Sequence, residues 1–177
     1  MSKLKIMGLP GSLRANSSSH VILQEVGRLL ATNADFEIYG GVGALPHFDG
    51  RDEDAPDVVL QFRRKIREAD AVVICTPEYA FGVPGSLKNA LDWTVGSGEF
   101  VNKPVALITA SSQGEKAHQA FQWILGAISA NLAPDHTLLI SFIRSKVKDG
   151  RVTEGSTQAE IVSLAERFLK SLQKEGN

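Results

Sequence analysis

A segment near the start of the chain is rich in hydrogen-bond donors. Residues 10–20 read Pro-Gly-Ser-Leu-Arg-Ala-Asn-Ser-Ser-Ser-His, with one guanidinium, several hydroxyls and no carboxylate. An apolar run precedes this segment and a helical pattern follows it, so the free N–H groups of a helix N-terminus would add to the donors. The sequence therefore predicts a phosphate site, and a serine-rich helix cap without a ligand is the alternative. The predicted ligands are Ser12, Arg14, Ser17, Ser18 and Ser19.

Motifs that the chain lacks narrow the kind of phosphate. No Gly-x-x-x-x-Gly-Lys-Ser/Thr sequence is present, which argues against a P-loop nucleotide site. The dinucleotide pattern Gly-x-Gly-x-x-Gly is also missing from the first turn, where the glycines are Gly8 and Gly11. Cys75 is not followed by the arginine of a cysteine-type phosphatase loop. These absences favour a monophosphate carried on a larger aromatic cofactor.

A second segment with chemical potential follows the apolar run 71–75. Residues 77–93 read Pro-Glu-Tyr-Ala-Phe-Gly-Val-Pro-Gly-Ser-Leu-Lys-Asn-Ala-Leu-Asp-Trp. Two prolines and a glycine predict a rigid loop that leads into a helix, at the carboxyl end of a central strand, where open α/β sheets bind ligands. The predicted cofactor contacts of this loop are Pro77, Glu78, Tyr79, Ala80 and Phe81.

These two segments together resemble the NADPH-dependent FMN reductase family. The resemblance rests on Gly-Ser-Leu-Arg at 11–14 with the serines at 17–19, and on Pro-Glu-Tyr, Pro-Gly and Leu-Lys-Asn-Ala-Leu-Asp-Trp within 77–93. It implies a flavodoxin-like fold, bound FMN, NADPH or NADH as co-substrate, and assembly as a homodimer or homotetramer. The chain departs from the family pattern at two positions. The family usually has Asn at the position of Ala80 and often has Asn at the position of Ser19.

The segments sit within a regular alternation of strands and helices. The expected strands are 3–9, 34–39, 71–76, 105–110 and 137–143, and the expected helices are 17–32, 57–69, 85–95, 115–131 and 156–174. Alternation predicts an α/β fold, a three-layer sandwich around a five-stranded parallel sheet of order 2-1-3-4-5. This topology brings loops 10–19, 77–82 and 111–115 to one edge and adds Ser111 and Gly114 to the candidate contacts. The flat ring would lie between the second and third loops.

Composition sets limits on partners and location. With 177 residues, the chain is expected to form a single domain, 1–177. A net charge of −1 without blocks of like charge gives no support for nucleic acid or membrane binding. One cysteine, no signal pattern and no long apolar run lead us to expect a cytoplasmic protein.

The sequence offers no catalytic side chain and no metal cluster. The four histidines, His20, His47, His118 and His136, are scattered. A flavin enzyme needs neither a catalytic side chain nor a metal cluster, because the flavin ring carries the redox chemistry. The expected reaction passes electrons from NAD(P)H to a small-molecule acceptor: a quinone, free flavin, azo compound or metal oxyanion. A flavodoxin-like electron carrier and a non-enzymatic phosphate-ligand module remain alternatives.

Two further expectations concern surfaces. The basic residues of the second helix are expected to face solvent; they are Arg63, Arg64, Lys65 and Arg67. Tyr79, Phe81 and the helix that ends at Trp93 are expected to form an apolar surface through which the chain dimerises.

Overall fold

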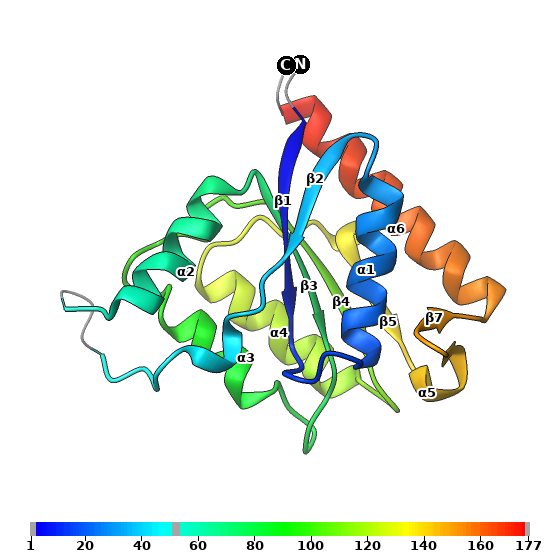
Figure 1. Cartoon of the computed structure of the whole chain (residues 1–177), viewed down its shortest axis with the longest axis horizontal. Coiled ribbons are helices and arrows are strands. Elements are labelled where there is room, and N and C mark those ends of the chain that lie inside the picture. The colour runs from blue at the N-terminus through cyan, green and yellow to red at the C-terminus, as the bar shows by residue number, and fades with distance from the viewer. Residues whose placement is uncertain (1–2, 51–53, 176–177) are drawn as a thin grey trace.

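A parallel five-stranded sheet forms the centre of the molecule, seen here in a computed structural model that describes residues 3–50 and 54–175. Its strands lie in the order β2-β1-β3-β4-β5, which confirms the predicted topology (Figure 1). They are β1 (Leu4–Pro10), β2 (Ala34–Ile38), β3 (Ala71–Thr76), β4 (Val105–Ala110) and β5 (Thr137–Ile140). Every residue of β3 and β4 is buried, as expected of central strands covered on both faces.

Helices cover both faces of the sheet and complete three layers (Figure 1). One face carries α1 (Ser18–Leu30) and α6 (Gly155–Glu175), which bury Ile22, Val26 and Phe168 against it. The other carries α2 (Asp57–Glu68), α3 (Gly85–Asp92) and α4 (Glu115–Ala127). No helix in the described ranges has the length and apolarity needed to cross a bilayer.

The first loop is held close against the end of β3. The Gly11 N–H donates a hydrogen bond to the Cys75 carbonyl oxygen at 2.8 Å. A Cβ atom at Gly11 would lie only 2.3 Å from Thr76 Oγ1, so only glycine permits this approach. The topological switch point between β1 and β3 is therefore built with the donor-rich loop directly beside β3.

The chain after β5 differs from the sequence prediction. The strand ends at Ile140 rather than at residue 143, because Phe142 adopts a left-handed backbone with φ 56°. A short helix α5 (Ile143–Lys146) follows, and then a hairpin of β6 (Val147–Lys148) and β7 (Arg151–Val152). Short 3₁₀ turns, η1 (Val42–Ala44) and η2 (Pro134–His136), occupy two other connections. Helix α4 also ends earlier than predicted, at Ala127.

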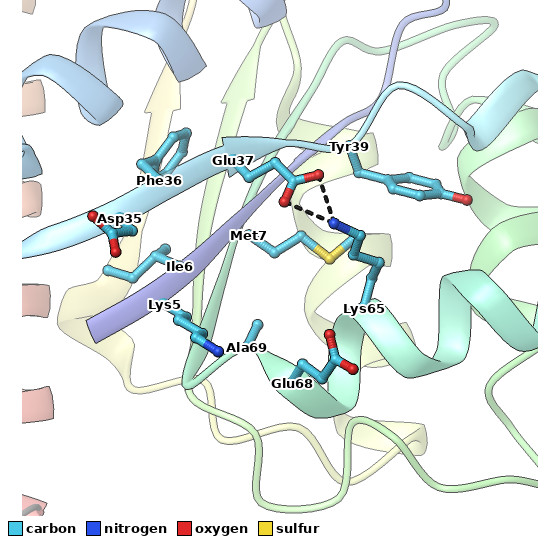
Figure 2. A pocket seen from close by; sticks show the side chains of 10 residues that line it. All are labelled: Lys5, Ile6, Met7, Asp35, Phe36, Glu37, Tyr39, Lys65, Glu68 and Ala69. Atoms are coloured by element: carbon cyan, nitrogen blue, oxygen red, sulfur yellow. Dashed lines mark hydrogen bonds and ion pairs between the residues drawn. The ribbon is translucent and has the colours of Figure 1, made fainter. Parts of the chain in front are cut away.

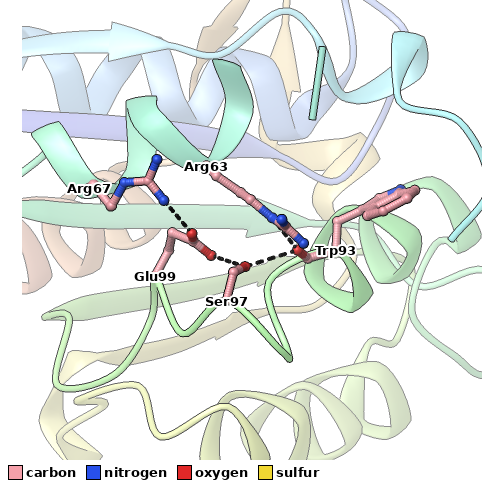
Figure 3. A network of polar contacts seen from close by, with 5 residues as sticks. All are labelled: Arg63, Arg67, Trp93, Ser97 and Glu99. Atoms are coloured by element: carbon pink, nitrogen blue, oxygen red, sulfur yellow. Dashed lines mark hydrogen bonds and ion pairs between the residues drawn. The ribbon is translucent and has the colours of Figure 1, made fainter. Parts of the chain in front are cut away.

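The expectation that all four basic residues of α2 face solvent is wrong for Arg63, which packs against a buried Trp93. Arg63 is buried; its Nε donates to the Trp93 carbonyl oxygen at 2.7 Å and its guanidinium lies over the indole at 5.8 Å (Figure 3). Trp93 is also buried, so it cannot contribute to an exposed dimer surface. Arg67 Nη1 donates to Glu99 Oε1 at 2.6 Å, and this carboxylate also accepts from Ser97.

Candidate functional site

The carboxyl edge of the sheet contains a small pocket between the loops that follow β1, β3 and β4, with a volume of about 170 Å³. We call it the inner pocket. It is lined by Ser12, Arg14, Ser17, Ser18, Ser19, Pro77, Glu78, Tyr79, Ala110, Ser111, Ser112, Ile143 and Arg144. The structure thus brings together residues that the sequence predicted from three separate loops. All three loops lie at the lower edge of the sheet in Figure 1, opposite the two chain termini.

The N-terminus of α1 opens into this pocket with its donors available. Ser17 is the N-cap, and its Oγ accepts a hydrogen bond from the His20 N–H at 3.2 Å. The N–H groups of Ser18 and Ser19 precede any intrahelical acceptor, and the first turn contains no acidic residue. This helix end therefore offers partial positive charge and hydrogen-bond donors to an anion.

A carboxylate of the protein itself already binds the N-terminus of α4. Glu78 Oε2 accepts a hydrogen bond from the Ala117 N–H at 2.9 Å, and Glu115 lies in the first turn. Gly114 is the N-cap, with φ 105°, and a Cβ there would lie 2.8 Å from Leu139 Cδ1. Gly114 thus acts through its backbone conformation and does not line the inner pocket. The Glu78 carboxylate points to the N-terminus of α4.

The loop between β3 and α3 is a tight, strained turn. The Tyr79 N–H donates to Gly82 O at 3.0 Å, and the Gly82 N–H donates to Tyr79 O at 2.9 Å. The two residues between them, Ala80 and Phe81, both have left-handed backbones, with φ 49° and 59°. Such a two-residue turn favours Asn and Gly at these positions, so Ala-Phe stores strain where the side chain of Phe81 is displayed to solvent.

A second, wider hollow adjoins the inner pocket; we call it the outer pocket. Its volume is about 430 Å³, and it is lined by Glu78, Ala80, Phe81, Ser111, Ser112, Gln113 and Phe142. The two pockets share Glu78, Ser111 and Ser112, so they lie next to each other. Phe81 and Phe142 are 72% and 69% exposed, which leaves aromatic walls available to a planar ligand.

Cys75 and His118 are poorly placed for nucleophilic or acid–base chemistry in this site. Burial raises the pKa of the Cys75 thiol to about 12, and a hydrogen bond with Ser19 acts in the opposite direction. His118 Nδ1 is 2.8 Å from Thr109 Oγ1, and partial burial lowers the pKa of the imidazole. In the described parts of the chain, no group of three or more His, Cys, Asp or Glu residues could hold a metal ion.

Another pocket lies between β2 and α2, with a volume of about 310 Å³ (Figure 2). We call it the β2–α2 pocket. Lys65 Nζ lies 2.9 Å from both carboxylate oxygens of Glu37, and the two side chains neutralise each other across its mouth. It lies beside the first half of β1, away from the carboxyl edge, and offers no helix N-terminus. The donor set of a phosphate site is found at the inner pocket instead.

Comparison with known proteins places this geometry in a family. The NADPH-dependent FMN reductase family profile matches residues 4–144. The chain belongs to this family. It is 28% identical to the quinone reductase of Escherichia coli K12 over 97% of both chains. It is 36% identical to an NAD(P)H-dependent FMN reductase of Pseudomonas aeruginosa, over 62% of this chain and 60% of that protein.

A solved flavoenzyme has the same overall architecture. The NAD(P)H:(acceptor) oxidoreductase FerB of Paracoccus denitrificans superposes with a TM-score of 0.81 at 27% identity, covering 97% of this chain and 98% of that one. The chain is thus an oxidoreductase of the NAD(P)H-dependent, FMN-containing type with a flavodoxin-like fold.

The donor set of the inner pocket suits the phosphate of FMN. Hydroxyls, a free helix N-terminus and guanidinium groups match a phosphate dianion, and the lining carboxylate of Glu78 is engaged with α4. Sequence reasoning missed Ser112, Gln113, Phe142 and Arg144, which complete the two pockets. Ser112 and Gln113 lie within the predicted third loop, but no sequence motif pointed to Phe142 or Arg144.

Proposed function

We propose that FMN binds with its phosphate in the inner pocket and its isoalloxazine ring in the outer pocket. The observation that carries this proposal is the convergence of Arg14 and the serines of the first loop with the free N-terminus of α1. The shared lining of the two pockets supports a ligand that spans both. The site residues proposed from the sequence keep their roles, except that Gly114 acts by shaping the start of α4.

Bound FMN supplies the redox chemistry, accepting hydride from NAD(P)H and passing electrons to an acceptor. The chain binds the phosphate through Arg14 and the hydroxyls and presents backbone groups of the second and third loops to the ring edge. No side chain serves as an obligatory acid or base, because Cys75 is buried with a raised pKa and His118 is hydrogen-bonded to Thr109.

We propose that the acceptor is a small planar molecule, with quinones favoured over metal oxyanions. The outer pocket is open, so one face of a flavin ring bound there would remain accessible, and flat aromatic rings stack well on one another. The similarity to the E. coli quinone reductase over nearly the whole chain supports the same acceptor class.

We also propose that residues 1–177 work as one domain in the cytoplasm, where NAD(P)H is available, and assemble as a homodimer or homotetramer. Tyr79 and Phe81 are 49% and 72% exposed beside the ligand loops, and Trp123 on α4 is 69% exposed. A two-fold interface uses such aromatic surface twice.

Sedimentation of the wild-type protein should give at least a dimer, and replacing both Tyr79 and Phe81 with Asp should shift the protein toward monomer. A wild-type monomer at micromolar concentration would contradict assembly.

The activity is tested by reducing the reconstituted protein. Purified protein is loaded with FMN, freed of excess flavin, and mixed anaerobically with NADPH and, separately, NADH. We expect the visible flavin absorbance to bleach without a partner enzyme and to return when benzoquinone is added. Protein stripped of FMN serves as the control and should not reduce the quinone. Bound FMN that neither nucleotide bleaches would contradict the proposal and favour an electron carrier.

A further inference from the structure

The segment after β5, residues 141–144, is tied to the loop that lines both pockets. The Phe142 N–H donates to Ser112 O at 3.1 Å, and the Ile143 N–H donates to Ser111 O at 3.0 Å. The left-handed backbone of Phe142 turns the chain at this point. A left-handed conformation at a bulky residue costs free energy, and such strain is concentrated at functional sites. The turn places the next residues against the inner pocket.

Arg144 lines the inner pocket together with Arg14. Neither guanidinium makes a hydrogen bond or an ion pair with any residue in the described ranges. Two unpaired cations on one pocket of about 170 Å³ repel each other. A phosphate monoester, which carries a charge of about −1.5 to −2 at neutral pH, would remove that repulsion and accept hydrogen bonds from both guanidinium groups.

Among the surroundings of Arg144, the inner pocket is the best place for an anionic partner. Arg144 and Asp149 both line a separate groove, but the two side chains form no ion pair. Phe142, two residues earlier, lines the outer pocket with a ring that is 69% exposed. One short segment therefore contributes a cation at the phosphate end of the site and an aromatic ring at the other.

We propose that residues 141–144 form a fourth cofactor-binding loop, in which Arg144 is a second phosphate ligand and Phe142 bounds the site of the flavin ring. This inference rests on the proposed FMN site and extends it beyond the three loops found from the sequence. It assigns different tasks to Arg144 and Phe142, so substitutions at the two positions should affect different parts of the flavin.

The phosphate role is tested by titrating FMN and riboflavin, which lacks the phosphate, into stripped protein. Arg144→Ala should weaken FMN binding by about tenfold or more, as expected for one charge-assisted hydrogen bond, and leave riboflavin binding unchanged. Arg151→Ala, on the nearby hairpin and outside both pockets, is the matched control and should change neither. Equal FMN affinities in Arg144→Ala and Arg151→Ala would overturn the assignment.

The ring role is tested with Phe142→Asn, because Asn tolerates the left-handed backbone while removing the aromatic ring. It should weaken FMN and riboflavin by the same factor, since the lost contact is with the ring they share. Unchanged affinity for both flavins would overturn the role of Phe142. If the wild-type protein binds neither flavin, the FMN site itself fails; if Arg14→Ala weakens FMN and Arg144→Ala does not, only the fourth loop fails.

Discussion

Arginines in two regions of the molecule have opposite surroundings. On α2, Arg63 donates to the Trp93 carbonyl oxygen and Arg67 to the Glu99 carboxylate, so the chain supplies its own acceptors (Figure 3). At the carboxyl edge, Arg14 and Arg144 meet no acceptor in the described residues. An arginine with an acceptor inside the protein thus stabilises the fold, whereas an arginine without one is available to bind a ligand.

The two helix N-termini beside the site repeat this contrast. Helix α4 has the Glu78 carboxylate on the Ala117 N–H, whereas α1 has a serine cap and no acid in its first turn. Because α4 is already compensated, the phosphate is expected at α1. The contrast makes a direct prediction: substitutions in the partnered region should cost stability, and substitutions at the open site should cost affinity.

The largest expected effect is on stability, from Arg63→Ala. The change leaves a cavity beside Trp93 and removes a buried hydrogen bond, so the free energy of unfolding should fall by about 2–4 kcal/mol. Denaturant titration measures this loss. Arg64→Ala is the matched control: its partner Glu68 is 3.9 Å away on the helix surface, and the loss should stay below about 0.5 kcal/mol. Equal losses in the two variants would break the comparison.

The next effect is on affinity, from Arg14→Ala. Losing a charge-assisted hydrogen bond of about 1.5–3 kcal/mol should weaken FMN binding about 10- to 150-fold. The free energy of unfolding without flavin should change by less than about 0.5 kcal/mol, because the guanidinium has no partner among the residues that the structure describes. Flavin fluorescence titration and denaturant unfolding give the two numbers. A variant that loses stability but keeps its FMN affinity would reverse the assignment.

A smaller effect is expected from relieving backbone strain at the site. Ala80→Asn places a residue that tolerates left-handed φ at a position with φ 49°. Stability should rise by about 0.5–1 kcal/mol, with the turn unchanged. The thermal midpoint of unfolding, measured without flavin, reports this gain. A fall in stability would show that the turn is not strained at this residue.

The smallest expected effect is a pH dependence from His118. Burial lowers the pKa of this imidazole in the folded state, so the unfolded chain binds a proton first as pH falls below about 6.5. The contribution of His118 to stability is therefore fully present above that pH and declines toward the lower folded-state pKa. His118→Gln should flatten the loss of stability between neutral and mildly acidic pH. An unchanged pH profile would show that another group controls it.

The fold could be predicted because each strand–helix unit is marked locally and the topology rule orders the units. The same rule places the loops after β1, β3 and β4 at one edge of the sheet. The sequence does not identify Phe142 and Arg144 as site residues, because Ser-Phe-Ile after Ile140 is typical of a longer strand. No local pattern predicts a left-handed backbone at Phe142. The Asp149-Gly150 pair is typical of a two-residue hairpin turn, and it connects β6 to β7.

The charge of Arg63 predicts a solvent-exposed side chain, whereas its position on α2 indicates a buried one. Val59, Phe62 and Ile66 form the buried stripe of α2, and position 63 lies four residues after Val59, on the same stripe. Long basic side chains can pack their stems on apolar surface and reach a buried acceptor. The acceptor itself, the Trp93 carbonyl oxygen, is distant in sequence and could only be found from the structure.

A crystal structure of the protein with bound FMN tests the central claim most directly. The account predicts electron density for the phosphate in the inner pocket, within hydrogen-bond distance of Arg14 and the first-loop serines, and for the ring in the outer pocket. Flavin density in the β2–α2 pocket, or a phosphate that contacts neither Arg14 nor the N-terminus of α1, would contradict it.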